Sequence, residues 1–445
     1  MEAYISSWRG GHFCEAELII FPKSVEELSR LVKLCSDSDI KIIPQGGNTG
    51  LVAGAIPTGK YQEIIINLSH MKSIISIDKQ NSNVIVEAGC TLAALQEAVA
   101  DAGFFFPLSI ASEGTAEVGG IISTNAGGTA VLKYGNTRDL TLGIEAILPD
   151  GSIYCDMKSL IKDNTGYDLK QLFIGAEGTL GIITKASFKI FPKINQQETA
   201  FLAVENINNA IEILHFMKEK SGNIVTTFEI ISKTCLNLVV KHIDGARKPI
   251  ETESLYYLLV ELSTPESGDN LRIKFENMLG ELFENGKILD AAIAESLKQT
   301  QDFWFIREHI SEAERKSGRG IHFDISLPIS KISSFINETD AKIAENTEAI
   351  IACFGHLGDG NLHYNMFLPH ETDDERFNQT KSILSEIIYD NCENMGGSFS
   401  AEHGVGASRK HLLEKYKSPI ELDLMKKIKQ SIDPKNIMNP EKIVG

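Results

Sequence analysis

Apolar positions in the first 190 residues follow two different spacings. Between residues 25 and 35 they recur at helical intervals, with Ser24 as the expected N-cap and Glu27 completing a capping box. Residues 91–102 predict a second helix, which Gly103 ends. Short apolar runs predict strands, because strands need only four to eight such residues. The expected strands cover residues 41–43, 64–67, 74–78, 84–87 and 143–148.

After residue 200 the pattern changes to strands that alternate with amphipathic helices. The expected strands cover residues 201–205, 225–230, 255–263, 288–293 and 322–327, and helices include 208–221 and 271–285. This alternation predicts an α+β domain, with an antiparallel sheet and helices on one face. A polar cluster near residues 193–199 marks the boundary before it. We divide the chain into domains 1–195 and 196–400 and a C-terminal segment, 401–445.

Composition restricts the partners of the protein. Its 445 residues include 43 basic and 60 acidic side chains, for a net charge of −17, which argues against nucleic acid and weakly against an anionic membrane. No apolar run approaches the roughly 20 residues that a membrane span needs, and the N-terminus does not resemble a secretory signal. Seven scattered cysteines without a Cys-x-x-Cys motif suit a reducing compartment. We expect a cytoplasmic protein without disulfides.

Three glycine-rich stretches stand out in the first domain. They cover residues 44–50, 107–135 and 175–184. Such turns let backbone N–H groups approach a phosphate, although a tight loop explains the first stretch equally well. Neither G-x-G-x-x-G opening a helix nor a P-loop is present, which disfavours a nicotinamide Rossmann site. The density of glycine in residues 107–135 indicates a backbone-lined trench for a long polar cofactor.

Residues 354–365 predict a β-hairpin with histidines on one face. With Asp359 and Gly360 at the tip, His356 lies opposite His363 and Phe354 lies opposite Asn365. Opposed side chains share a face, so the two imidazoles can bind one metal ion, and Asn365 points the same way. A lone histidine in an apolar strand is more often a core residue.

Glu402 and His403 lie in a second glycine-rich motif, so the hairpin histidines do not stand alone. Together these residues make a metal site the better explanation. We assign Asp359 to turn geometry rather than to the metal.

Several of these motifs are long enough to indicate a family. The segments Pro-Gln-Gly-Gly-Asn-Thr-Gly (44–50), Ser-Thr-Asn-Ala-Gly-Gly (123–128) and Gly-Ala-Glu-Gly-Thr-Leu-Gly-Ile (175–182) resemble the FAD domain of vanillyl-alcohol-oxidase-type flavoproteins. Nearly the whole chain resembles their D-2-hydroxyglutarate dehydrogenase and FAD-linked D-lactate dehydrogenase branch. The resemblance implies a two-part FAD-binding domain in residues 1–195, an antiparallel substrate or cap domain, and a C-terminal segment that returns to the FAD domain.

The resemblance also implies the cofactor contacts. The turns at 46–50 and 114–115 would contact the pyrophosphate, residues 123–128 with Tyr134 would line the flavin, and Gly178 with Ile183 would lie nearer the adenine. FAD is expected to be non-covalent, because no histidine or cysteine stands where some relatives attach it. The implied cofactor-binding residues are Pro44, Gly46, Gly47, Asn48, Thr49, Gly50, Leu51, Pro107, Ser109, Gly114, Thr115, Gly119, Gly120, Ser123, Thr124, Asn125, Gly127, Gly128, Tyr134, Glu177, Gly178, Gly181, Ile183 and Asn439.

A second set of residues is implied for the substrate. Arg307 would bind the substrate carboxylate; from the residues alone, a surface pair with Glu308 or Glu314 is the better interpretation. Ser311 lies four residues further on and is expected on the same helix face. His322 stands where relatives usually carry a lysine for a distal carboxylate, which weakens the inference to D-2-hydroxyglutarate.

The metal and the base are implied in the same way. His356, His363 and Glu402 would bind a divalent ion, with zinc expected first and manganese or iron also compatible. Asn365 would contact the substrate, and His403 would be both a substrate contact and the general base.

The implied activity is FAD-dependent, metal-assisted oxidation of a D-2-hydroxy acid to the 2-oxo acid. Electrons would pass to an external acceptor, such as a quinone or an electron-transfer flavoprotein, and a homodimer is compatible with the sequence. The alternatives are a glycolate-oxidase-type FAD subunit of a larger complex and a non-redox transferase like alkyl-glycerone-phosphate synthase. Peripheral membrane association, or a mitochondrial location in a eukaryote, are the alternatives to the cytoplasm.

Overall fold

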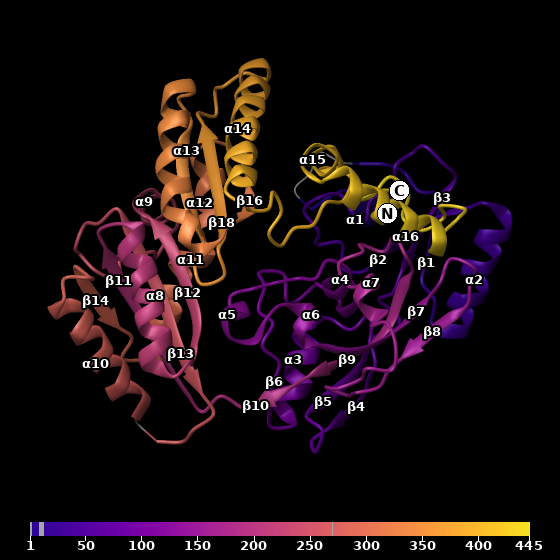
Figure 1. The fold of residues 1–445 in the computed structure, drawn as a ribbon, viewed down its shortest axis with the longest axis horizontal. Helices are drawn as coiled ribbons and strands as arrows, with labels where there is room; N and C mark the ends of the chain where they lie inside the picture. Colours follow the sequence, from indigo (N-terminus) through magenta and orange to yellow (C-terminus); the bar gives the residue numbers. More distant parts are fainter. Residues whose placement is uncertain (1, 9–12, 269) are drawn as a thin grey trace. The chain divides into compact units, whose positions relative to one another are not determined.

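The computed structural model describes residues 2–8, 13–268 and 270–445 and divides them into two compact units (Figure 1). The first unit comprises the chain up to Gly128, Tyr134–Lys193 and Glu402–Gly445. The second unit comprises Thr129–Lys133 and Ile194–Ala401. The C-terminal segment therefore belongs to the same unit as the glycine-rich stretches.

A small parallel sheet begins the first unit. Its strands β1 (Leu18–Ile20), β3 (Glu63–Asn67) and β2 (Lys41–Gln45) lie in that order, and α2 (Val25–Ser38) packs against them. Ser24 is the N-cap of α2, as predicted, since its hydroxyl accepts the Glu27 N–H. The Glu27 carboxylate accepts the Lys23 N–H, one residue earlier than in the predicted capping box.

The C-terminal segment extends this parallel sheet. Met438 forms a parallel bridge with Ile42 of β2, and Ile42 hydrogen-bonds the backbone on both sides of it. Helix α16 (Pro419–Ile432) precedes this contact, after α15 (Lys410–Tyr416). The last residues are thus part of the core of the first unit, where Ile437 and Met438 are buried.

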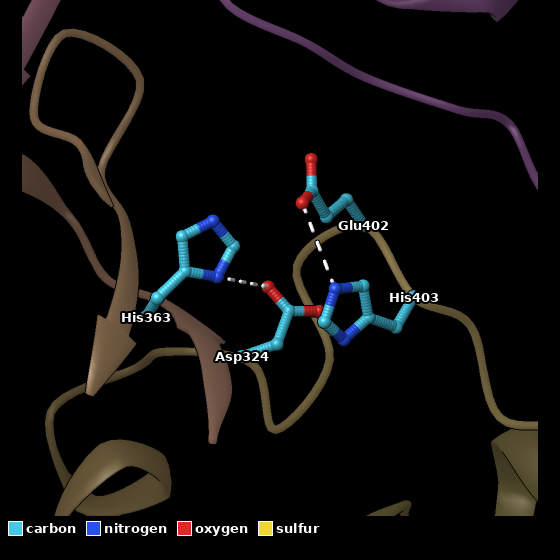
Figure 2. Close-up of side chains that lie close together, drawn as sticks. All are labelled: Asp324, His363, Glu402 and His403. Carbon is cyan, nitrogen blue, oxygen red and sulfur yellow. Dashed lines mark ion pairs between the residues drawn. The ribbon is translucent and has the colours of Figure 1, made fainter. Parts of the chain in front are cut away.

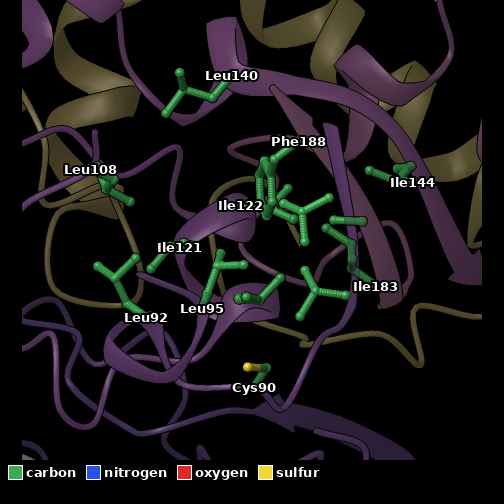
Figure 3. Packing of buried hydrophobic residues seen from close by; sticks show 14 of the residues in the cluster. Cys90, Leu92, Leu95, Leu108, Ile121, Ile122, Leu140, Ile144, Ile183 and Phe188 are labelled. Atoms are coloured by element: carbon green, nitrogen blue, oxygen red, sulfur yellow. The ribbon is translucent and has the colours of Figure 1, made fainter. Parts of the chain in front are cut away.

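A five-stranded antiparallel sheet completes the first unit. The strands follow the order β4 (Ile74–Asp78), β5 (Asn83–Glu87), β9 (Ile182–Lys189), β7 (Thr141–Ile147) and β8 (Ile153–Asp156). Helices α3 (Leu92–Asp101) and α4 (Val118–Ser123) pack their apolar side chains against it, and Figure 3 shows this core. The shorter elements are α1 (Glu2–Ile5), β6 (Phe104–Phe105), α5 (Val131–Tyr134), α6 (Thr137–Leu140), α7 (Lys170–Phe173) and β10 (Phe191–Pro192).

An eight-stranded antiparallel sheet forms the second unit. Seven strands lie in the order β14-β11-β13-β12-β17-β18-β15, and β16 also pairs with β18. The antiparallel sheet confirms the predicted architecture. The strand bounds are β11 Gln196–Val204, β12 Val225–Ser232, β13 Tyr256–Thr264, β14 Asp290–Ile293, β15 Arg319–Ile321, β16 Asp324–Ser326, β17 Ile350–His356 and β18 Asn361–Leu368.

Helices cover both faces of this sheet, so the prediction of helices on one face was wrong. Residues 199–204 of β11 are all buried, which requires cover on each side of a pleated strand. One face packs on α9 (Lys233–His242), α11 (Leu297–Glu308) and α12 (Ile310–Ser317). The strands also contact α8 (Ile207–Ser221) and α10 (Asn270–Glu284). These two helices contribute no side chain to the apolar core of that first face, so they cover the other one. The remaining helices are η1 (Ile329–Lys331), α13 (Ile332–Asn346) and α14 (Asp374–Asn394).

No helix in the described ranges combines the length and the apolar character that crossing a membrane requires.

Candidate active site

The hairpin of β17 and β18 has a different register from the predicted one. His363 lies opposite Phe354, and Asn365 lies opposite Ala352, whereas His356 pairs with Glu229 of β12. The predicted direct opposition of His356 and His363 was wrong, because four residues rather than two connect the strands. A shift by two residues leaves every side chain on its original face. The two imidazoles therefore still share a face, with ring centroids 5.6 Å apart.

A buried carboxylate joins two of the predicted site residues. Oε1 of Glu229 lies 2.6 Å from Nδ1 of His356, and Oε2 accepts the Nε–H of Arg307 at 2.7 Å. Burial alone would raise the pKa of Glu229, but the charges of His356 and Arg307 outweigh it and hold the pKa at about 2. Glu229 was not among the predicted site residues. A lone charged residue in the β-branched and aromatic run 225–231, Val-Thr-Thr-Phe-Glu-Ile-Ile, was the available signal.

Arg307 faces the sheet rather than the surface of the helix. Its guanidinium lies 4.7 Å from the ring centroid of Phe354, and its side chain is 12% exposed. The helix is interrupted after Glu308, and α12 starts anew at Ile310. Ser311 is exposed, so the predicted common face of Arg307 and Ser311 was wrong. Helical periodicity does not extend across such a break.

Asn365 and His322 meet a second buried carboxylate. Glu314 is 2% exposed and accepts the Nδ2–H of Asn365 at 3.0 Å. Nδ1 of His322 lies 4.0 Å from the same carboxylate. Oδ1 of Asn365 accepts the Phe323 N–H at 3.2 Å, which fixes the orientation of its amide. Asn365, His322 and Glu314 thus form one polar group beside β18.

Four side chains form a group that could bind a metal ion. Asp324, His363, Glu402 and His403 each offer one ligand atom, and these atoms lie within 4.8 Å of one another (Figure 2). Nδ1 of His363 lies 3.9 Å from Oδ1 of Asp324, and Nε2 of His403 lies 3.7 Å from Oε1 of Glu402. The donor set of imidazole nitrogens and carboxylate oxygens fits zinc, manganese or iron.

The chain connectivity explains why these residues meet. The Ala401 N–H donates to the Asp324 carbonyl, and Glu402 is the next residue. Asp324 is buried and accepts the Nδ2–H of Asn361 at 3.0 Å. His363 and Glu402, both predicted as ligands, belong to this group, whereas Asp324 was missed and His356 lies outside it.

The three glycine-rich stretches converge within the first unit. A Cβ on Gly47 would lie 1.8 Å from the Thr115 carbonyl oxygen, so the first and second stretches touch through their backbones. The Glu177 N–H donates to the Ser123 carbonyl, and Gly178, at φ +72°, packs against Pro44. Positions with open space instead are Gly50, Gly114 and Gly120, where a Cβ would meet no atom within 4 Å.

The other predicted cofactor residues lie in or beside the same elements. Asn48 and Asn125 adopt positive φ, Tyr134 packs on Phe191, and Gly128 touches the Ser109 carbonyl. Leu51 and Thr49 follow β2, Pro107 follows β6, Gly119 belongs to α4, Thr124 and Gly127 follow α4, Gly181 precedes β9, and Ile183 belongs to β9.

Glu177 and Asn439 hold the C-terminal segment on these stretches. The buried Glu177 carboxylate accepts the N–H groups of Val405 and Gly406, both at 2.8 Å. Burial raises the pKa of Glu177, although these two hydrogen bonds oppose the shift. Nδ2 of Asn439 donates to the carbonyls of Gly54 and Glu177. These two predicted cofactor residues therefore position the segment that carries His403.

Comparison with known proteins decides the family. Residues 16–155 match the family described as FAD binding domain, and residues 193–443 match FAD linked oxidases, C-terminal domain. The chain belongs to the FAD-linked oxidases. Within this family it is similar to the mitochondrial D-2-hydroxyglutarate dehydrogenase of Arabidopsis thaliana, with 36% identity over 444 residues, or 100% of this chain and 78% of that protein. It is also similar to the D-2-hydroxyglutarate dehydrogenase of Stutzerimonas stutzeri (strain A1501), with 34% identity over 447 residues, or 100% of this chain and 94% of that protein.

A solved structure confirms the fold of this family member. p-Cresol methylhydroxylase with substrate bound superimposes with a TM-score of 0.73 over 96% of this chain and 88% of that one, at 17% identity. The predicted vanillyl-alcohol-oxidase-type fold and the FAD cofactor are therefore confirmed. The convergent glycine-rich stretches, with open space at Gly50, Gly114 and Gly120, fit this cofactor.

Proposed function

We propose that this chain oxidises a D-2-hydroxy acid, of the D-2-hydroxyglutarate or D-lactate type, to the corresponding 2-oxo acid. The proposal rests on the group of imidazoles and carboxylates around His363 and His403, and on Glu229 of β12, which binds both Arg307 and His356 of the hairpin. The names of the two dehydrogenase relatives support the substrate class.

Arg307 is proposed to bind the substrate carboxylate. Glu229 occupies its Nε–H, which fixes the plane of the guanidinium, and the Nη groups of such a plane can donate two parallel hydrogen bonds to a carboxylate. The contact with the Phe354 ring restrains the guanidinium further. Glu229 also binds His356, so one buried carboxylate sets the orientation of both side chains.

His363 and Glu402 of the four-residue group are proposed as metal ligands together with His356, which lies outside that group but shares a face of the hairpin with His363. Glu229 lies at Nδ1 of His356, which makes Nε2 the ligand atom, as in carboxylate–histidine–metal arrangements. Asp324 has a similar relation to Nδ1 of His363, at 3.9 Å. A divalent ion in this site would polarise the substrate hydroxyl as a Lewis acid.

His403 is proposed to accept the hydroxyl proton. Imidazole ordinarily titrates near neutral pH, and Glu402 beside it would stabilise the charged form. Asn365 and His322 are proposed to contact the rest of the substrate, and Ser311, being exposed, contributes least. FAD supplies the acceptor of the hydride at its N5, and reoxidation requires an external acceptor such as a quinone or an electron-transfer flavoprotein.

Anaerobic titration of the FAD-loaded protein tests the proposal. D-lactate, D-2-hydroxyglutarate or D-malate should bleach the oxidised flavin spectrum, and the L-enantiomers should not. A spectrum left unchanged by every D-hydroxy acid, in protein with a measured metal content, would refute the activity.

Variants separate the metal site from the base. His363→Ala should lose bound metal with FAD retained, and His403→Asn should slow flavin reduction by about 10²–10⁴-fold with metal retained. Equal reduction rates for His403→Asn and the wild type would remove the base assignment.

A further inference from the structure

Glu117 is a buried carboxylate without a partner at the glycine-rich turn. It lies between Thr115 and α4, is 6% exposed, and its Oε2 has no hydrogen-bond partner in the structure. Oε2 is the nearest atom to the position that a Cβ on Gly46 would take, at 3.1 Å. Gly47, the next residue, packs directly on the Thr115 carbonyl. Glu117 therefore lies where the first and second glycine-rich stretches meet.

No cation compensates the charge of this carboxylate among the described residues. The turn of residues 44–50 contains no charged side chain. On the other side, the backbone of Glu117 forms a bridge with Thr91, the residue after Cys90. The pKa of the Cys90 thiol is raised, first by its burial and then by the charge of Glu117. Burial likewise raises the pKa of Glu117, to about 8. At neutral pH the side chain is thus mainly a neutral acid, which can donate a hydrogen bond.

We propose that Glu117 binds the pyrophosphate of FAD as a neutral carboxylic acid, by donating its O–H to a phosphate oxygen. Three observations support this role: the orphaned Oε2, its position against Gly46, and the open space at Gly50 and Gly114. A dinucleotide phosphate supplies the acceptor that Oε2 lacks. An ionised carboxylate at this position would instead repel the phosphate, so protonation and FAD binding are coupled.

The coupling predicts how FAD affinity depends on pH. Loss of the Glu117 proton removes a donor and adds a negative charge, so the dissociation constant of FAD should rise about tenfold between pH 7 and pH 9. FAD binding at pH 9 should also take up close to one proton. This inference concerns the cofactor alone and does not depend on the proposed hydroxy acid substrate.

The experiment measures FAD binding to the full-length protein. Holoprotein is dialysed against graded FAD at pH 7, 8 and 9, and bound flavin is quantified. Glu117→Gln keeps a neutral hydrogen-bond donor and should bind FAD with the same affinity at pH 7, 8 and 9. Glu117→Leu has no donor and should bind FAD weakly at each pH. Glu113→Gln is the control, because the Glu113 carboxylate accepts the Ser109 hydroxyl and should leave the wild-type pH dependence intact.

Calorimetry of FAD binding to flavin-depleted wild-type protein gives a second measurement that needs no variant. Titrations at pH 9 in buffers with different ionisation enthalpies report proton uptake directly. Uptake near one proton per FAD supports the proposal. An uptake of zero, or a Glu117→Gln variant with the full wild-type pH dependence, would overturn it.

Discussion

The buried pair of Glu229 and Arg307 makes a quantitative prediction about stability. Glu229 is 1% exposed in its side chain and Arg307 is 12% exposed. Arg307→Met keeps most of the apolar stem but leaves the Glu229 charge with His356 as its remaining partner. Removing one partner of a buried pair costs about 3–5 kcal/mol, and we expect the lower end because His356 remains.

This loss corresponds to a measurable change in melting temperature. For a unit of about 200 residues, each kcal/mol shifts Tm by roughly 2–4 °C, so Arg307→Met should lower the Tm of the second unit by ~6–12 °C. Glu229→Gln should lower it less, because Arg307 is closer to solvent and can be hydrated. The double variant should recover part of the loss of Arg307→Met.

Heating scans followed by circular dichroism measure these differences. Arg376→Met is the matched control, because its pair with Glu348 is exposed and such pairs contribute only about 0–1 kcal/mol. A Tm for Arg307→Met within about 1 °C of the control would refute the assignment of a buried, charge-compensating pair. So would a larger loss for Glu229→Gln than for Arg307→Met.

Three further predictions concern the first unit. Gly47→Ala should abolish FAD binding, because its Cβ would overlap the Thr115 carbonyl, while the control Gly280→Ala in α10, where a Cβ would meet no atom within 4 Å, should retain it; the flavin content of the purified variants distinguishes them. Glu177→Gln should loosen the segment after residue 402, since hydrogen bonds to a charged acceptor contribute ~1.5–3 kcal/mol each, and faster hydrogen exchange there is the readout. Flavin-free protein should lose stability as pH rises from about 4.5 to 8, because the raised pKa of Glu117 means that the folded state binds more protons; Glu117→Gln should flatten the decline in Tm.

Local features of the chain were predictable from its sequence. Ser24 fixed the start of α2, and the apolar runs located many strands of both units, because capping and side-chain alternation depend on neighbouring residues; β1, β8, β9 and β15 were not predicted. The face shared by His356 and His363 was also predictable, since alternation with a period of two survives an error of two residues in register.

Features that depend on distant partners were not predictable. Glu229 lies 127 residues before His356 in the chain, and pairing between β12 and β17 brings them together. Asp324 likewise reaches the metal-binding group only because β16 pairs with β18. The break at His309 and the helices on the second face of the sheet depend on tertiary packing, which a single helical or strand period does not record.

The division of the first unit along the chain affects how the protein is made. Its last part, Glu402–Gly445, supplies the backbone that pairs with β2 and the N–H groups that Glu177 binds. A ribosome synthesises this part after the whole of the second unit. The second unit can therefore fold during translation, whereas the FAD-binding unit stays incomplete until Glu402–Gly445 has been synthesised. Truncation at residue 401 should consequently damage the flavin unit more than the unit to which the cut is adjacent.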